Sequence, residues 1–127
     1  MSHQSLSKKN KDGVTIVELG PEYENLEESL LDQIQAYLLE TADEIDPPYL
    51  VVDLSRTQFF GSSFIEVLFR VWNRIKKRDG RFALCALRDY CDEVIQITNL
   101  DRVWGIYPDQ DSAVDGINSG RNPEAKS

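Results

Sequence analysis

The sequence predicts an α/β fold with a mixed sheet of four or five strands and about four helices. Short apolar segments recur at residues 14–19, 49–54, 82–87 and 103–107, and such segments between turn residues are typical of strands. The stretches between them carry apolar residues at steps of three and four, the period of a helix. From residue 49 onward strands and helices alternate, which implies parallel strands joined by right-handed crossovers.

A chain of 127 residues suits one domain, since domains commonly hold ~100–150 residues. We place that domain at residues 13–117. Residues 118–127 are polar and are expected to form a disordered C-terminal tail. Residues 1–12, with Lys8, Lys9 and Lys11, are expected to form a flexible N-terminal tail, and a short edge strand within them is the alternative.

The first half of the domain is predicted to contain a strand, a helix and a second strand. Residues 14–19 alternate and are rich in β-branched side chains, and Gly20-Pro21 ends that strand. Asn25, with Glu28 three residues later, matches the N-cap of a helix. Pro47 and Pro48 close this helical unit because proline cannot continue a helix. The apolar run 49–54 then predicts a strand buried on both faces.

The second half repeats the alternation. A helix is expected from Ser62 or Ser63 to Arg78, with Ser63 and Glu66 as a capping box and Asp79-Gly80 as its stop. Four further elements follow in the sequence: a strand at 82–87, a helix that Asp89 can cap and that ends near Asn99, a strand at 103–107, and a short helix at 109–117.

Net charge and the lengths of the apolar stretches argue against several classes of function. The chain has 22 acidic and 14 basic residues and a formal charge of −8, whereas a general nucleic-acid binder needs a basic surface. No apolar stretch approaches the ~18 residues of a membrane span, and residues 1–12 lack the apolar core of a secretory signal. We therefore expect a cytoplasmic protein that binds neither nucleic acid nor membrane.

Charge is also unevenly distributed along the chain. Residues 18–46 hold ten acidic side chains and no basic one, whereas residues 70–88 hold seven basic side chains and one acidic. Two interpretations stay open. The segments form two solvated helix faces, or they form a polar surface that steers a charged protein partner.

Catalytic and metal-binding motifs are missing from the sequence. Cys85 and Cys91 have no Cys or His partner at metal-ligand spacing, so we expect two free thiols in a reducing compartment. The single histidine, His3, lies in the polar N-terminal segment, which disfavours a Ser-His-Asp or Cys-His site. No Walker-type loop is present. We therefore expect that the protein is not an enzyme and that it binds neither a metal ion nor a cofactor.

The junction between residues 54 and 63 is the most informative segment. A buried strand ends there, Phe59 and Phe60 follow, and Gly61 precedes two serines at a helix N-terminus. A helix N-terminus favours an anion or phosphate, although plain N-capping by Ser62 or Ser63 also explains the serines. Asp53 is expected to hold the following loop by local hydrogen bonds.

These motifs, in this order, resemble the STAS domain of bacterial anti-sigma factor antagonists. The family's central motif is a strand ending in D-L-S, a short loop, and D-S-S-G-L opening a helix. The corresponding residues here are Asp53-Leu54-Ser55 and Gly61-Ser62-Ser63-Phe64-Ile65. Ile97-Thr98-Asn99-Leu100 matches the family's later L-T-G-L-like stretch. The resemblance covers residues ~14 to ~117 of the sequence, a span that fits one domain.

The resemblance implies a regulatory protein partner, a serine kinase that is also an anti-sigma factor. It assigns the phosphorylated serine to Ser62, with Ser63 as second choice. The unphosphorylated antagonist binds the partner and the phosphorylated form does not. The expected partner-binding residues are Ser55, Thr57, Phe59, Phe60, Gly61, Ser62, Ser63 and Phe64.

Two positions depart from the family pattern. Gly61 replaces the aspartate before the serines, and Tyr23 replaces the acidic residue that often follows the first strand. The sequence therefore leaves two alternatives to a phosphorylation switch. One is a constitutive scaffold in a signalling assembly, and the other is a domain that binds a small ligand or nucleotide.

Overall fold

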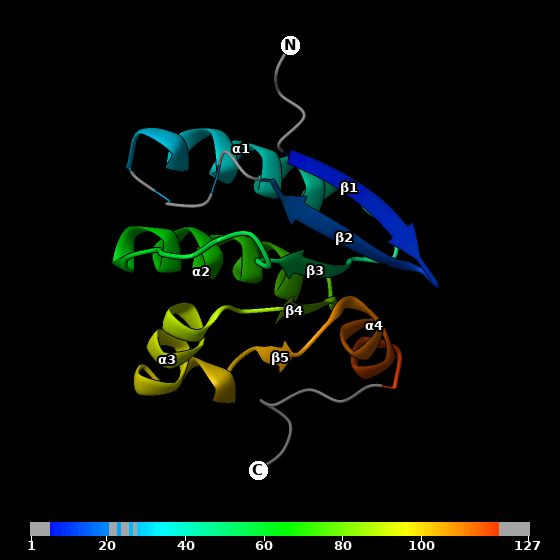
Figure 1. Ribbon diagram of the computed structural model, residues 1–127. Helices are drawn as coiled ribbons and strands as arrows, with labels where there is room; N and C mark the ends of the chain where they lie inside the picture. Colours follow the sequence, from blue (N-terminus) through cyan, green and yellow to red (C-terminus); the bar gives the residue numbers. More distant parts are fainter. Residues whose placement is uncertain (1–5, 21–22, 24–25, 27, 120–127) are drawn as a thin grey trace.

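A computed structural model describes the chain except for residues 1–5, 21–22, 24–25, 27 and 120–127. Five strands form one sheet in the order β1-β2-β3-β4-β5, with β1 antiparallel to β2 and the other pairs parallel (Figure 1). The elements are, in order, β1 (Leu6–Lys11), β2 (Val14–Leu19), α1 (Glu28–Glu44), β3 (Tyr49–Asp53), α2 (Ser62–Lys77), β4 (Arg81–Cys85), α3 (Asp89–Ile97), the 3-10 helix η3 (Leu100–Arg102), β5 (Gly105–Tyr107) and α4 (Gln110–Asn118). The predicted α/β fold, with its mixed sheet and four helices, is confirmed.

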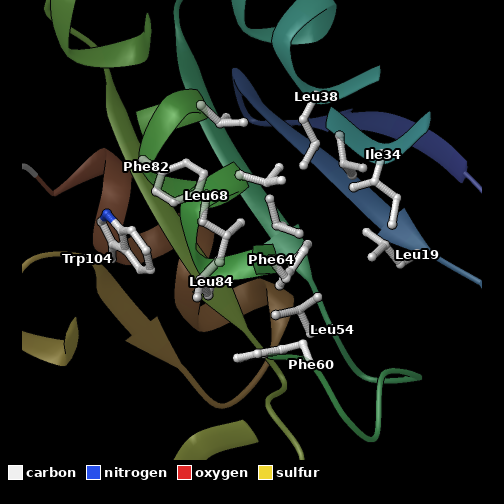
Figure 2. Close-up of a cluster of buried hydrophobic side chains, with 14 of the residues drawn as sticks. Leu19, Ile34, Leu38, Leu54, Phe60, Phe64, Leu68, Phe82, Leu84 and Trp104 are labelled. Carbon is white, nitrogen blue, oxygen red and sulfur yellow. The ribbon is translucent and has the colours of Figure 1, made fainter. Parts of the chain in front are cut away.

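The sheet is covered on both faces. Successive residues of β3 alternate between two cores: Leu50 and Val52 belong to the larger one and Val51 to the smaller one. The larger core contains the buried side chains of α1, α2 and α3, among them Ile34, Leu38, Phe64 and Leu68 (Figure 2). The smaller core lies under α4. The prediction that β3 is buried on both faces is thus confirmed, and helix packing fixes its register because a one-residue slip would exchange the two sets.

The acidic and basic segments meet at the surface of the molecule, where α1 packs beside α2. Arg74 forms an ion pair with Asp43 at 2.7 Å. Arg78 donates to the carbonyl oxygens of Ala42 and Ile45 at 2.8 and 2.7 Å. These oxygens lie at the C-terminal end of α1, where the helix dipole favours a cation. Part of the charge segregation therefore joins two helices of the same chain.

Residues 6–11, expected within a flexible tail, instead form the edge strand β1, which was the alternative for this segment. Its burial is low throughout, so the sequence carries no apolar pattern to reveal it. Three lysines of the strand form ion pairs with α1, β2 and α4: Lys8 pairs with Glu44 at 3.9 Å, Lys9 with Glu18 at 3.2 Å, and Lys11 with Asp111. Lysines on an edge strand also oppose pairing with further chains. Residues 1–5 and 120–127 lie outside the described residues, where both tails stay predictions.

Two predicted helix caps are wrong. Helix α2 begins at Ser62 and its N-cap is Gly61, so Ser63 and Glu66 do not form a capping box. Helix α3 has Arg88 as its N-cap, which places Asp89 in the first turn. The N-caps of the two helices lie two residues and one residue before the expected caps, because an extended residue can serve as N-cap without a capping side chain. The Asn25 cap predicted for α1 lies outside the described residues.

The predicted stop of α2 is confirmed in position but not in detail. The residue in the left-handed region is Asp79, with φ of 60°, and the N–H of Gly80 bonds to the carbonyl of Ile75 at 2.9 Å. Gly80 is needed for a different reason: a Cβ at this position would lie 2.0 Å from the Pro48 carbonyl oxygen. The end of α2 therefore packs directly on the backbone that precedes β3.

Gly80→Ala should destabilise the protein by about 1–3 kcal/mol, because the backbone of Pro48 must move to admit the methyl group. Gly61→Ala is the matched control. A Cβ at Gly61 meets nothing within 4 Å, and exchanging these two residues at an N-cap costs less than about 1 kcal/mol. Urea unfolding followed by circular dichroism compares them. Equal midpoints for the two variants would contradict the packing described here.

Candidate functional site at the β3–α2 junction

Parallel strands β2, β3 and β4 end at one edge of the sheet, and the N-termini of α2 and α3 begin there (Figure 1). In open α/β sheets this carboxyl edge is where function concentrates. The junction loop, residues 54–61, crosses the edge from β3 to α2.

Three hydrogen bonds hold the junction loop between Ser55 and Phe59. Its first part is held by Asp53, whose carboxylate accepts from the Ser55 N–H at 2.8 Å, as the sequence predicts. The Thr57 hydroxyl, fully buried, donates to the Tyr23 carbonyl at 3.2 Å. The Phe59 carbonyl accepts from the Leu26 N–H at 3.1 Å. The loop is thus bonded to the segment between β2 and α1, and its shape is set before any partner arrives.

Tyr23, at the position where the family often has an acidic residue, is a structural residue here. Its side chain is 3% exposed, and its hydroxyl donates to the Gln33 side chain of α1 at 3.1 Å. The aromatic ring joins the larger core. Where the family often has a charged side chain, this chain therefore has an aromatic ring that packs in the larger core next to the junction loop.

Ser62 is exposed and is the first residue of α2. Gly61 before it has extended backbone, with φ of −115° and ψ of −168°, and its carbonyl accepts from the N–H groups of Phe64 and Ile65 at 3.2 and 3.3 Å. The first turn of α2 carries no acidic side chain. Ser62 therefore lies at the positive end of a sixteen-residue helix, where added negative charge is favoured. Ser63 is half-buried.

The three phenylalanines of the junction have different surroundings. Phe60 and Phe64 are 1% and 0% exposed, and their rings pack at 5.1 Å between centroids (Figure 2). Phe59 is 46% exposed and stacks on Tyr90 of α3 at 5.3 Å. Of the expected partner-binding residues, Thr57, Phe60 and Phe64 are therefore core residues that position the loop. Ser55, Phe59 and Ser62 are exposed, and Gly61 and Ser63 are partly so.

Sequence reasoning missed Tyr90. It follows the strand β4 by five residues and lies 31 positions from Phe59, so no local pattern links the two rings. The available signal was topological, because the residues after neighbouring parallel strands meet at one edge.

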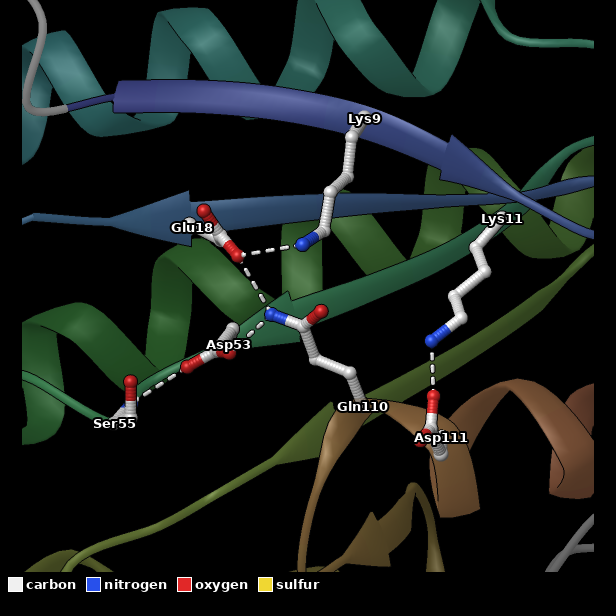
Figure 3. Close-up of polar contacts among 7 residues, drawn as sticks. All are labelled: Lys9, Lys11, Glu18, Asp53, Ser55, Gln110 and Asp111. Carbon is white, nitrogen blue, oxygen red and sulfur yellow. Dashed lines mark hydrogen bonds and ion pairs between the residues drawn. The ribbon is translucent and has the colours of Figure 1, made fainter.

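A polar cluster behind the junction was also missed. The side-chain amide of Gln110, the first residue of α4, donates to Glu18 at 2.7 Å and to Asp53 at 2.6 Å (Figure 3). Lys9 pairs with the same Glu18. Glu18 and Asp53 are register partners at the ends of β2 and β3, so one amide satisfies two adjacent carboxylates and joins α4 to the sheet.

The two thiols are free and buried. Burial, followed by the negative charge of Asp53, raises the pKa of Cys85 to about 12, and burial raises the pKa of Cys91 to about 11. Both therefore stay protonated near neutral pH and behave as small apolar groups. Among the described residues, no three His, Cys, Asp or Glu side chains gather as metal ligands. Within the same residues, no helix combines the length and apolar character needed to cross a bilayer.

The fold and the junction define a single α/β module whose exposed serine opens a helix at the carboxyl edge of the sheet. The STAS domain family model matches residues 6–113, and the chain belongs to that family. A comparison with curated proteins gives no match.

Solved structures agree with this assignment. An anti-sigma-factor antagonist (STAS) domain protein from Planctomyces limnophilus is 35% identical, with a TM-score of 0.83 over 89% of this chain and 97% of that one. An anti-sigma factor antagonist from Mycobacterium paratuberculosis is 24% identical, with a TM-score of 0.76 over 89% and 92% of the two chains. The anti-sigma factor antagonist SpoIIAA, in its unphosphorylated form, is 16% identical, with a TM-score of 0.74 over 90% and 96%. The last two show the fold alone.

Gln110→Ala should destabilise the protein by about 1–3 kcal/mol, because it leaves the nearly buried Asp53 carboxylate and Glu18 side by side without their shared donor. Gln96→Ala is the control. The Gln96 amide also bonds a carboxylate, that of Asp92 at 3.0 Å, but on the exposed surface of α3, so its loss should change stability by less than about 0.5 kcal/mol. Chemical unfolding measures both. Equal losses would show that the Gln110 bridge is no stronger than a surface contact.

The thiols should resist a disulfide reagent at pH 8 in the folded protein and react when it is unfolded in urea.

The raised pKa of Cys85 also predicts that the stability of the protein depends on pH. The contribution of Cys85 to the free energy of unfolding is complete below the usual thiol pKa of 9.0 and is lost as pH rises toward about 12. Cys85→Ala should therefore show a shallower fall of the unfolding free energy above pH 9 than the wild type. Parallel curves would contradict the buried setting of this thiol.

Proposed function

We propose that this protein is a regulatory protein–protein interaction module of the anti-sigma factor antagonist type, switched by phosphorylation of Ser62. The observation that carries the proposal is the position of Ser62, exposed at the N-terminus of α2 directly after a loop of fixed shape. The partner is a serine kinase that is also an anti-sigma factor. The 35% identity to an antagonist-type STAS protein over nearly the whole of both chains supports this class of partner.

The chemistry of the switch follows from the site. The Ser62 hydroxyl attacks the γ-phosphorus of ATP in the kinase, the bond to ADP breaks, and the hydroxyl proton is released. The phosphate adds roughly −1.5 to −2 charge at neutral pH. In the free protein the positive end of α2 stabilises that charge. In a packed interface the same dianion must lose water and is repelled by acidic neighbours, so the phosphorylated form leaves the partner.

A constitutive scaffold without a covalent switch is the second candidate. The observation that favours it is the replacement of both acidic positions near the serine, by Gly61 and by the buried Tyr23. In that case the module binds its partner through the same surface and Ser62 serves only as the first residue of the helix.

Incubation with ATP and the purified anti-sigma serine kinases encoded in the source genome should place phosphate on Ser62, as mapped by mass spectrometry. Ser62→Asp should weaken kinase binding by at least about tenfold, or ~1.4 kcal/mol, whereas Ser62→Ala should bind like the wild type. Ser63→Ala controls for the neighbouring hydroxyl and should leave both phosphate transfer and binding intact. Equal binding by the Asp and Ala variants, with no phosphate on Ser62, would favour the scaffold.

A further inference from the structure

Large apolar side chains are exposed at three positions of the described chain: Phe59 at 46%, Tyr90 at 47% and Ile97 at 73%. Two of them, Phe59 and Tyr90, stack with an interplanar angle of 28° although they come from different elements. We call them the aromatic pair. Ile97, at the other end of α3, has no such aromatic neighbour among the contacts described.

The aromatic pair is held outward by its buried neighbours. Phe60 and Cys91, the residues that follow Phe59 and Tyr90, are 1% and 0% exposed, so the next positions along both segments already fill the core. The Phe59 carbonyl is bonded to Leu26, and the Cys91 thiol contacts the Thr57 carbonyl at 3.7 Å. Neither ring can enter the core without unfolding the junction. A rigid exposed aromatic surface binds a partner at a low entropic cost.

Two arginines accompany the aromatic pair. Arg56 lies in the junction loop, and Arg88 directly precedes α3 and donates to the Ser55 carbonyl at 3.4 Å. Both are exposed, and neither takes part in an ion pair recorded for the described residues. The acidic side chains beside them, Asp89 and Asp92, belong to the first turn of α3, where they complement its dipole. Aromatic residues and arginine are the types that dominate interface energetics.

We propose that the aromatic pair, with Arg56 and Arg88, forms the main contact for the partner protein, and that the partner offers an apolar pocket bordered by carboxylates. This inference rests on the proposed function and names the chemistry of its partner. A second copy of this chain fits poorly, because a two-fold interface at this patch places the same arginines opposite each other and each copy carries a net charge of −8.

The inference also explains how Ser62 acts as a switch. Phe59 precedes Ser62 by only three residues, and both are exposed at the same end of the sheet. A phosphate on Ser62 therefore meets the carboxylates that Arg56 and Arg88 attract. Repulsion from the partner, rather than a rearrangement of this module, then ends the complex.

Binding of the purified kinase to single variants tests this contact by calorimetry. Phe59→Ala and Tyr90→Ala should each weaken binding at least tenfold. Arg56→Glu and Arg88→Glu should also weaken binding at least tenfold, and the affinity of these two variants should depend less on salt concentration. Ile97→Ala and Arg102→Glu are matched controls, an exposed apolar side chain and an exposed cation away from the pair, and should change affinity less than twofold. Thermal unfolding checks that each variant is folded.

The outcomes separate the two proposals. If the wild type binds and the aromatic variants bind equally well, only the aromatic contact is overturned. If the wild type binds none of the kinases, the proposed function and this inference both fail. If sedimentation shows a dimer of the wild type that Phe59→Ala dissociates, the patch joins two copies of this chain, and the inference is overturned.

Discussion

The structure depends on the carboxylate of Asp53 at the end of the central strand β3. One of its oxygens accepts from the Ser55 N–H and starts the junction loop, while the other accepts from Gln110 of α4. Asp53 as a whole is 7% exposed, and a carboxylate in such a place is costly unless donors of this kind satisfy it. The same side chain therefore fixes the start of the loop that leads to Ser62 and attaches α4, the helix on the opposite face of the sheet from α2. Its place at the carboxyl edge makes this possible, since strand end, loop and helix start meet there.

Several charged side chains of this protein act within the chain. The acidic segment that includes α1 and the basic segment that includes α2 lie against each other through Arg74 and Asp43 and through Arg78 at the end of α1. The lysines of β1 act in the same way on three other elements. Exposed pairs of this kind each contribute little to stability, and they add to contacts that the apolar core and the sheet already make. Arg56 and Arg88 are outside this set, and we propose that they act on a partner instead.

The apolar elements could be predicted from sequence, and the polar ones could not. The runs of β2, β3 and β4 and the helical period of α1 and α2 follow from burial, which selects residues at each position. Strand β1 is held by three lysines and by pairing with β2, and neither leaves a hydrophobic pattern. At the site, the position of Ser62 and the role of Asp53 were predicted. The separation of Phe59 from Phe60 and Phe64 required the actual path of the loop, and Tyr90 and Gln110 are brought in only by tertiary structure.

Gly61 and Tyr23 together define what a phosphate at Ser62 encounters in the free module. With no acidic side chain in the first turn of α2 and an uncharged ring at Tyr23, negative charge at Ser62 meets the helix dipole and little local repulsion. The junction loop keeps its bonds to Leu26 and Tyr23, because these involve the Phe59 carbonyl and the Thr57 hydroxyl rather than the hydroxyl of Ser62. If Ser62 is phosphorylated as we propose, the effect of the phosphate is therefore expected in the complex, where the charges of the partner oppose it.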